Sequence, residues 1–237
     1  MRLDKFLCDC LGVTRKEATK LLKSGAIELN QKTVKSGSVK VSDQDSVCWQ
    51  ERELALKGPR YIMLYKPEGF VCSHEDGFNH TAFVLLDEVR YDDLHFAGRL
   101  DVDTTGLVLI TDDGQWSHRI TSPKHKCSKT YLVELADPIQ SHYAAEIEQG
   151  ILLRNEKEPT KPGVMEQIDL HTARLTISEG KYHQVKRMFA ALGNKVEGLH
   201  RESIGAITLD PNLEPGEYRD LTEQEILSVW PSSKEHE

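Results

Sequence analysis

The sequence predicts an α+β fold in two parts: a small N-terminal module, and a larger domain with a mixed, largely antiparallel sheet flanked by helices. Segments of alternating apolar residues recur from residue 60 onward, without a regular strand–helix–strand order. This irregular order favours an antiparallel or mixed sheet with helices outside it over a doubly wound parallel sheet. A polar stretch that ends at Gly58-Pro59 is typical of a linker between the two parts.

The chain length sets the domain organisation. Its 237 residues allow one small and one medium-sized domain with a sizeable core. We place the N-terminal module and its linker at residues 1–58 and the larger domain at residues 59–231. The polar residues 232–237 are expected to form a disordered tail.

In the N-terminal module we expect two helices followed by short strands. The first helix spans residues 3–11, and the second begins at Thr14, where Thr14 and Glu17 form a T-x-x-E capping box. Gly25 is a natural stop for this helix. One side of the second helix is basic, with Arg15, Lys16, Lys20 and Lys23.

The larger domain shows both strand and helix patterns. Strands are expected in the segments YIMLYKP, LVLITDD, TYLVEL, ARLTISEG and GAITL. Helices are expected over residues 141–149, 182–192 and 222–229. The apolar face of the 182–192 helix consists of Val185, Met188, Phe189 and Leu192. A second face of the same helix carries His183, Lys186 and Arg187.

Charge is distributed unevenly along the chain. Residues 1–40 contain nine Lys or Arg and four acidic residues, whereas the whole chain has a formal net charge of −8. A basic end on an acidic protein indicates a polyanionic partner, and a solvated basic face is the alternative interpretation.

The cysteines and the N-terminus indicate the compartment. Five scattered cysteines form no CxxC pair, which argues against a disulfide scaffold or a Cys-rich zinc site and favours a reducing cytoplasm. The first residues, MRLDKFLCDC, are acidic where a signal peptide has its apolar run, and no segment approaches the ~18 apolar residues of a membrane span. We expect a soluble, cytoplasmic protein that is a monomer by default.

The segment GRLDVDTTG, residues 98–106, has two carboxylates one residue apart, and two metal-dependent interpretations fit its spacing. Positions one, three, five, six and twelve of an EF-hand loop match Asp101, Asp103, Thr105, Gly106 and Asp112. The β-rich GLVLIT stands where that motif needs a helix. The DxDxT pattern also fits a phosphatase nucleophile, but Asp112-Asp113 follows too soon to be its distant acidic pair.

A third interpretation makes one aspartate the reacting group without a metal. The segment HRITSPKHKCSKTY contains four cations and no acid, which is typical of a polyanion-binding surface. These cations are Arg119, Lys124, Lys126 and Lys129. A cation on the 182–192 helix could pair with a carboxylate and keep it ionised. A solvated charged loop is the alternative.

Two sets of segments resemble known families. At the N-terminus, RLDKFL and TRKEATKLLKSGAIELN resemble an S4 RNA-binding module. Further on, LHFAGRLDVDTTGLVLITDDG, KTYLVEL and EGKYHQVKRMFAALG resemble the motifs of the RsuA/RluB/E/F family of pseudouridine synthases. The length and the S4-like module are most similar to the members that modify 16S rRNA, for which uridine-516 is the usual target.

The resemblance implies an activity and roles for residues. A uridine would be isomerised without metal or organic cofactor, and the partner would be 16S rRNA or a small-subunit assembly intermediate. Asp101 would be the catalytic aspartate, Tyr131 would lie against the base, and Lys186 would pair with Asp101. Arg99 would enter the RNA, and Arg187 is a second candidate for the paired cation. The alternatives are Asp103 as the catalyst, the same reaction on 23S rRNA, and a non-catalytic RNA-binding assembly factor.

Overall fold

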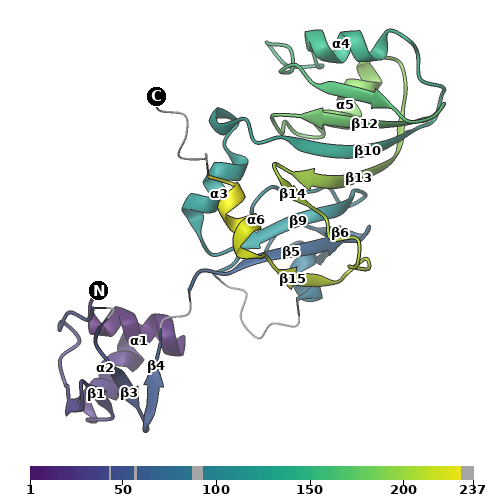
Figure 1. Cartoon of the computed structure of the whole chain (residues 1–237). Coiled ribbons are helices and arrows are strands. Elements are labelled where there is room, and N and C mark those ends of the chain that lie inside the picture. The colour runs from purple at the N-terminus through teal and green to yellow at the C-terminus, as the bar shows by residue number, and fades with distance from the viewer. Residues whose placement is uncertain (43, 56–57, 87–92, 231–237) are drawn as a thin grey trace, which may run out of the picture. The chain divides into compact units, whose positions relative to one another are not determined.

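The computed structural model describes residues 1–42, 44–55, 58–86 and 93–230 (Figure 1). The chain divides into two compact units, Met1–Gly58 and Pro59–Glu237. The expected tail at 232–237 lies outside the described residues, as does residue 231 at the end of the expected larger domain.

The N-terminal unit packs two helices against a small sheet. Its elements are α1 (Leu3–Leu11), α2 (Arg15–Lys23), β1 (Ile27–Leu29), β2 (Lys32–Thr33), β3 (Val47–Trp49) and β4 (Arg52–Leu54). The four strands are antiparallel neighbours in the order β2-β1-β3-β4. The capping box is confirmed: the Thr14 hydroxyl accepts from the Glu17 amide, and the Glu17 carboxylate accepts from Thr14.

A single apolar cluster holds this unit together. Leu3 and Leu7 of α1, Leu22 of α2 and Ile27 of β1 are almost completely buried in it. Burial of each such side chain contributes roughly 1.5–3 kcal/mol. Because one side of α2 packs against this cluster, the other side faces solvent. The four cations expected on that helix are all exposed.

The larger unit is built on a mixed sheet. Its strands are β5 (Tyr61–Lys66), β6 (Phe70–Val71), β7 (His80–Thr81), β8 (His95–Phe96), β9 (Thr105–Thr111), β10 (Lys129–Leu135), β11 (Val164–Gln167), β12 (Thr172–Ile177), β13 (Val196–Ile204), β14 (Ile207–Thr208) and β15 (Tyr218–Asp220). Its helices are α3 (Gly114–Thr121), α4 (Tyr143–Gln149), α5 (Gln184–Ala191) and α6 (Glu223–Ser228), with 3-10 turns η1 (Ala82–Leu85) and η2 (Pro123–His125).

Within the described residues, nine of these strands form one sheet. Its main path is β11-β12-β10-β13-β9-β5-β15, with β14 beside β13 and β8 beside β9. The β13–β9 pair is parallel and the other pairs in the sheet are antiparallel. The expected α+β class with a mixed, largely antiparallel sheet is confirmed.

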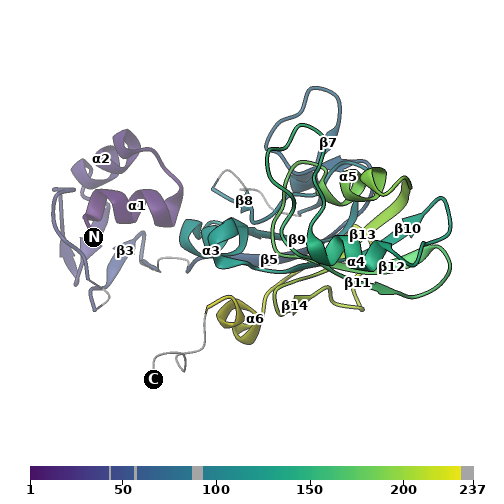
Figure 2. The same ribbon diagram turned by 90° about the horizontal axis from the view of Figure 1, so that it is seen from above.

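Alternation along the strands places apolar side chains on both faces of the sheet. In β5, Ile62 and Leu64 join a core with α4 and α5, whereas Met63 joins a second core with α3 and α6. This follows from the two-residue period of a strand. Figure 2 shows α5 and α6 on opposite sides of the sheet.

The structure corrects several element predictions. The helix expected over 182–192 begins at Gln184, because His183 has a left-handed backbone with φ 48° and ψ 37°. Helix α3 was not predicted at all, although Asp113 caps it by accepting from the Gln115 and Trp116 amides. The strand expected in GAITL is reduced to the two residues of β14. Two-residue strands such as β6, β7 and β8 are too short for a periodic pattern.

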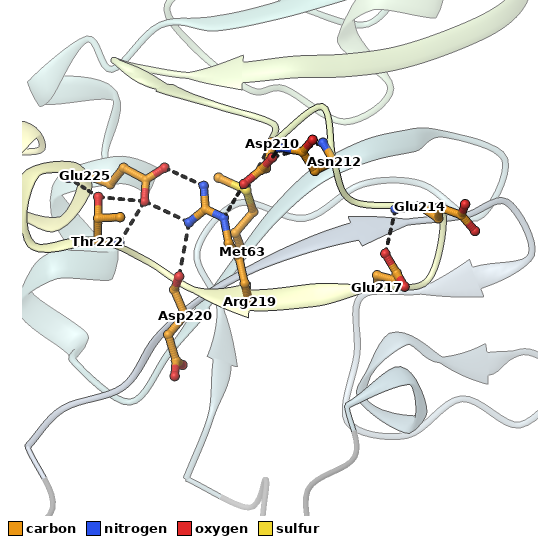
Figure 3. Close-up of polar contacts among 9 residues, drawn as sticks. All are labelled: Met63, Asp210, Asn212, Glu214, Glu217, Arg219, Asp220, Thr222 and Glu225. Carbon is orange, nitrogen blue, oxygen red and sulfur yellow. Dashed lines mark hydrogen bonds and ion pairs between the residues drawn. The ribbon is translucent and has the colours of Figure 1, made fainter.

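Arg219 of β15 fastens the C-terminal helix to the sheet (Figure 3). Its guanidinium donates to Asp210 at 2.7 Å and to both carboxylate oxygens of Glu225 at 2.9 Å. Glu225 also completes a capping box with Thr222 at the start of α6. The pKa of Glu225 is lowered to about 2, mainly because its carboxylate accepts the hydrogen bond from Arg219.

Candidate active site

The two aspartates lie in a short segment between β8 and β9, and two buried cations hold its backbone. We call residues 98–104 the aspartate loop. Arg201 of β13 is only 2% exposed. Its guanidinium donates to the carbonyls of Gly98 at 2.8 Å and Arg99 at 3.3 Å, and to that of Leu107 in β9 at 2.8 Å. A single planar fork thereby ties the beginning of the loop to the strand that follows it.

The second buried cation is Lys66, at the end of β5. Its Nζ donates to the carbonyls of Thr104 at 2.7 Å, Pro67 at 2.9 Å and Val102 at 3.4 Å. Burial lowers the pKa of Lys66, while the nearby Asp103 and Asp101 charges oppose that shift. Lys66 therefore holds the end of the loop through carbonyl oxygens while placing a positive charge near both carboxylates.

Sequence reasoning missed both buried cations. At Lys66 the available signal was a lysine at the end of the apolar run YIMLYK, since Lys and Arg are rarely fully buried unless partnered. Arg201 gave no such signal, because its strand VEGLHRESI also contains Glu197 and Glu202. The pattern does not reveal their acceptors, because those carbonyls lie on segments distant in sequence.

Gly106 is required where the loop enters β9. Its φ is +104°, and a Cβ at this position would lie 2.3 Å from the backbone oxygen of Arg201. The parallel pairing of β9 with β13 brings these two backbones together. A side chain is thus excluded both by the torsion angle and by space.

A cleft of about 780 Å³ opens beside the aspartate loop. Its lining includes Asp101 and Arg99 from the loop, Tyr131 from β10, and His183 and Lys186 from the α5 region. A second hollow of about 560 Å³ is lined by Tyr65, His200 and residues near β14. The aspartates are not part of the lining of that second hollow, so the larger cleft is the candidate active site.

The two aspartates differ in their position relative to the cleft. The Asp101 side chain is 32% exposed and lines the cleft, whereas that of Asp103 is 55% exposed and is not part of the lining. His183 Nε2 lies 3.4 Å from Asp101 Oδ1. Asp101 is thus the carboxylate available to a ligand in the cleft.

Lys186 lies between the two carboxylates. Its Nζ is 3.6 Å from Asp101 Oδ2, the expected partner, but donates to Asp103 Oδ1 at 2.5 Å. Burial acts to raise the pKa of Asp103, and the hydrogen bond and charge of Lys186 outweigh it, so that the pKa is lowered overall. One ammonium therefore serves both aspartates, and its shorter contact is with the one outside the cleft.

Arg187, the second candidate for the paired cation, points elsewhere. Its guanidinium donates to Glu156 at 3.1 Å and to the carbonyl of Arg154 at 2.7 Å. Because neighbouring residues of a helix lie about 100° apart, Lys186 and Arg187 cannot both face the same carboxylate.

Tyr131 lies in the wall of the cleft. It is 9% exposed and belongs to the same apolar core as the buried side chains of α5. In the sheet, Tyr131 of β10 lies opposite Leu175 of β12 on one side and Arg201 of β13 on the other. The guanidinium carbon of Arg201 is 6.0 Å from its ring centre. Tyr131 is therefore held rigidly by the sheet while its ring borders the space next to Asp101.

The expected basic surface is only partly present. Lys124 and Lys126 are exposed on the segment around η2, and Arg99 is exposed at the cleft. Arg119 is half-buried, with Nε donating to the carbonyl of Val229. Lys129 differs from the expectation: it is buried, and its Nζ donates to the carbonyls of Ile120 and Cys127 at 2.9 and 2.7 Å. It borders the cleft but stabilises the segment that carries Lys124 and Lys126.

The EF-hand interpretation of the aspartate loop fails on the fold. Positions five to eleven of the proposed EF-hand loop form strand β9, and the Asp112 carboxylate accepts from the backbone amide of Arg60. Within the ranges that the structure describes, no group of three or more His, Cys, Asp or Glu side chains could hold a metal ion. The aspartates instead have cationic partners.

Each of the two units matches a known protein family. Residues 1–47 match the S4 domain, and residues 60–191 match the family described as RNA pseudouridylate synthase. The second match spans more than half of the chain and includes the aspartate loop, Tyr131 and Lys186.

The chain belongs to the pseudouridine synthase family. It is an isomerase, and the resemblance inferred from its motifs is confirmed.

This pseudouridine synthase has similar relatives over its full length. It is 74% identical to "Ribosomal small subunit pseudouridine synthase A" of Vibrio vulnificus, over 97% of this chain and 100% of that protein. It is 58% identical to the protein of the same name from Haemophilus influenzae, over 95% of this chain and 98% of that protein. A solved structure, "Crystal structure of pseudouridylate synthase", is 56% identical, covers 97% of this chain and 100% of its own, and has a TM-score of 0.71.

In the described part of the synthase, no helix has the length and apolarity to cross a bilayer. All five cysteines are free thiols, and Cys72 is a buried residue of the cleft lining, where burial raises its pKa.

Proposed function

We propose that the protein isomerises a uridine of 16S rRNA to pseudouridine, with Asp101 as the reacting carboxylate. The observation that carries the proposal is the position of Asp101 in a cleft that Tyr131, Arg99 and Lys186 also line, with the Lys186 ammonium 3.6 Å from its carboxylate. The small-subunit substrate is supported by the names of relatives that are 54–74% identical over nearly their full length.

The reaction needs an ionised carboxylate and a place for a turned base. The N1–C1′ bond of uridine breaks, the uracil turns, and C5 bonds to C1′; N1 ends with a proton, and C5 loses its hydrogen to water. Asp101 acts either as a nucleophile or as the base that takes a proton from the sugar, and both roles require its anion. No atom is added and no electron is transferred, so neither a metal nor a cofactor is required by this chemistry.

The surrounding residues have roles that follow from their positions. Lys186 places its ammonium 3.6 Å from Asp101 and shares it with Asp103, so a positive charge lies next to the reacting carboxylate. Tyr131 offers the face or edge of its ring to the extruded base, which has lost its stacking in the RNA. Arg99 and the exposed Lys124 and Lys126 contact phosphates, and the exposed cations of α2 add sequence-independent affinity.

The proposal is tested with uridine-labelled RNA. Wild-type protein is incubated with 16S transcripts or small-subunit assembly intermediates carrying 5-³H-uridine, and release of tritium into water is measured with EDTA present. We expect stoichiometric release, with the product at uridine-516, and no release with Asp101→Asn. Loss of activity on addition of EDTA would contradict the metal-free chemistry.

Three other outcomes would replace the proposal. Release from 23S but not 16S transcripts would move the substrate to the large subunit. RNA binding without release by the wild type would indicate a non-catalytic assembly factor. Full activity of Asp101→Asn together with inactive Asp103→Asn would make Asp103 the catalyst.

A further inference from the structure

One exposed aromatic side chain lines the cleft, and another lies two residues from a lining residue; neither has a role in the reaction. In the described part of the chain, the exposed Phe, Tyr and Trp side chains are Phe78 (101%), Tyr182 (75%) and Trp230 (40%). Tyr182 lines the cleft, and Phe78 follows the lining residue Asp76 by two positions. Of the two most exposed aromatic rings, Tyr182 is thus part of the cleft lining and Phe78 is on a turn that contributes Asp76 to it.

Tyr182 extends from the catalytic residues toward solvent. Its ring stacks on that of His183, with 3.8 Å between ring centres and an angle of 21° between planes. His183 in turn lies 3.4 Å from Asp101. His183 also has a left-handed backbone, uncommon for a residue with a side chain, directly before α5 begins. The result is a flat ring supported from below and open to solvent.

Phe78 is presented by a turn built for rigidity. The Asp76 carboxylate accepts from the Phe78 amide at 2.9 Å and from the Asn79 amide at 2.8 Å. The first of these hydrogen bonds is the main cause that lowers the pKa of Asp76. At the base of the turn, the His74 ring stacks on the buried Phe83 ring, with 4.7 Å between centres. The Phe78 ring is thus fully exposed on a hydrogen-bonded turn and makes no contribution to the core.

We propose that Tyr182, supported by His183, and Phe78 stack on the nucleobases that flank the target uridine. The inference rests on the proposed function and specifies its substrate: a uridine in unpaired RNA whose neighbours are also unstacked. Extrusion of one base into the cleft deprives its neighbours of a stacking partner, and aromatic rings replace that partner with little sequence preference. The two rings would thus help to hold the strand open while Asp101 reacts.

The test compares steady-state kinetics on a short unpaired RNA that contains the target uridine. We expect Tyr182→Ala and Phe78→Ala each to raise KM about tenfold and to change kcat less than about twofold, because stacking on a flanking base contributes to binding. Tyr182→Phe and Phe78→Trp keep a ring and should behave like the wild type. The matched control is Leu170→Ala, which removes another exposed apolar side chain that is not part of the cleft lining.

An abasic nucleotide placed on either side of the uridine separates stacking from a structural effect. On the flank that a ring contacts, the abasic substrate should raise KM for the wild type, and the corresponding alanine variant should add no further increase. Active wild-type enzyme with unchanged KM in both alanine variants would overturn the inference, as would fully additive effects at both flanks. If the wild type releases no tritium from any transcript, the proposed function itself has failed.

Discussion

Asp101 and Asp103 show how position separates two identical side chains. The loop backbone, held by Arg201 and Lys66, places Asp101 in the cleft and Asp103 outside it. Lys186 makes its shorter contact with Asp103 and its longer one with Asp101. The arrangement leaves Asp101 free to approach a ligand while it remains within the field of the ammonium.

Removal of the Lys186 charge should impair chemistry more than binding. Lys186→Met is expected to lower kcat about a hundredfold, because a preorganised charge at the reacting carboxylate is lost, and to change KM little. Single-turnover tritium release measures the effect. Lys186→Arg keeps the charge and serves as the control; if it is as defective as Lys186→Met, the role depends on the shape of lysine rather than on its charge.

Asp103→Asn should separate support from catalysis. The substitution frees Lys186 to move toward Asp101, so we expect activity within about tenfold of the wild type, in contrast to the loss in Asp101→Asn. The two variants are compared at equal RNA occupancy in the same tritium assay. Equal defects in both would show that the carboxylates act as a single unit.

At the level of elements, β9 and β13 determine where the aspartate loop can lie. Their parallel pairing at Thr105–His200 and Gly106–Arg201 brings the buried guanidinium under the loop. The Thr105 hydroxyl also hydrogen-bonds His200 Nδ1 across this pair at 2.9 Å. A change that separates the two strands should therefore affect folding and catalysis together.

Gly106→Ala provides that change. Its Cβ would meet the Arg201 backbone in a left-handed conformation, so we expect a loss of about 3 kcal/mol in the free energy of unfolding, measured by urea denaturation. Gly114→Ala, at the start of α3 with open space around the added Cβ, is the control and should change stability by less than about 1 kcal/mol. Equal stability of the two variants would show that the strands yield at Gly106.

The attachment of α6 should depend on pH through Glu225. The pKa of this residue is about 2 in the folded protein, below the ordinary 4.5. Its contribution to stability is therefore complete above pH 4.5 and is lost as the pH falls toward 2. Glu225→Gln should cost about 1–2 kcal/mol at neutral pH and flatten the fall of stability in this acidic range.

The control for α6 is Glu223→Gln on the same helix, whose side chain is exposed. Thermal unfolding of the three proteins from neutral to acidic pH gives the comparison. The assignment is wrong if the wild type and Glu225→Gln lose stability in parallel as the pH falls.

At the level of the whole molecule, the two units divide chemistry from affinity. The cations of α2 are exposed on the S4 unit, while the cleft and its aspartates lie entirely in the larger unit. Phosphate contacts on the first unit would raise affinity for RNA of any sequence, whereas the second unit selects and turns the base.

A fourfold substitution of Arg15, Lys16, Lys20 and Lys23 by Gln tests this division. The slope of log K against log salt, where K is the association constant for single-stranded RNA, is negative. Its magnitude should decrease by up to about 3, as expected for four lost phosphate contacts. The control is Lys5→Gln, because the Lys5 ammonium is already paired with Asp9 at 2.9 Å. An unchanged slope would remove α2 from the RNA interface.

Much of the fold could be predicted because it rests on local rules. Residues close together in the sequence were enough to predict the capping box at Thr14 and Glu17, the apolar face of α5, and the alternation in β5 and β10. Helix α3 was missed because its last residues, HRIT, were interpreted as the start of a basic polyanion-binding segment. Lys129 was misplaced because a basic run does not reveal which of its members turns inward.

The sequence by itself determined the α+β class, the two-part organisation of helices and strands, and the family to which the motifs belong. These depend on residue type, periodicity and spacing along the chain. Only the tertiary structure decided that Arg201 and Lys66 hold the aspartate loop, that Lys186 serves both carboxylates, and that Arg187 turns to Glu156. Each of these contacts joins residues at least 30 positions apart, and no local pattern fixes their approach in space.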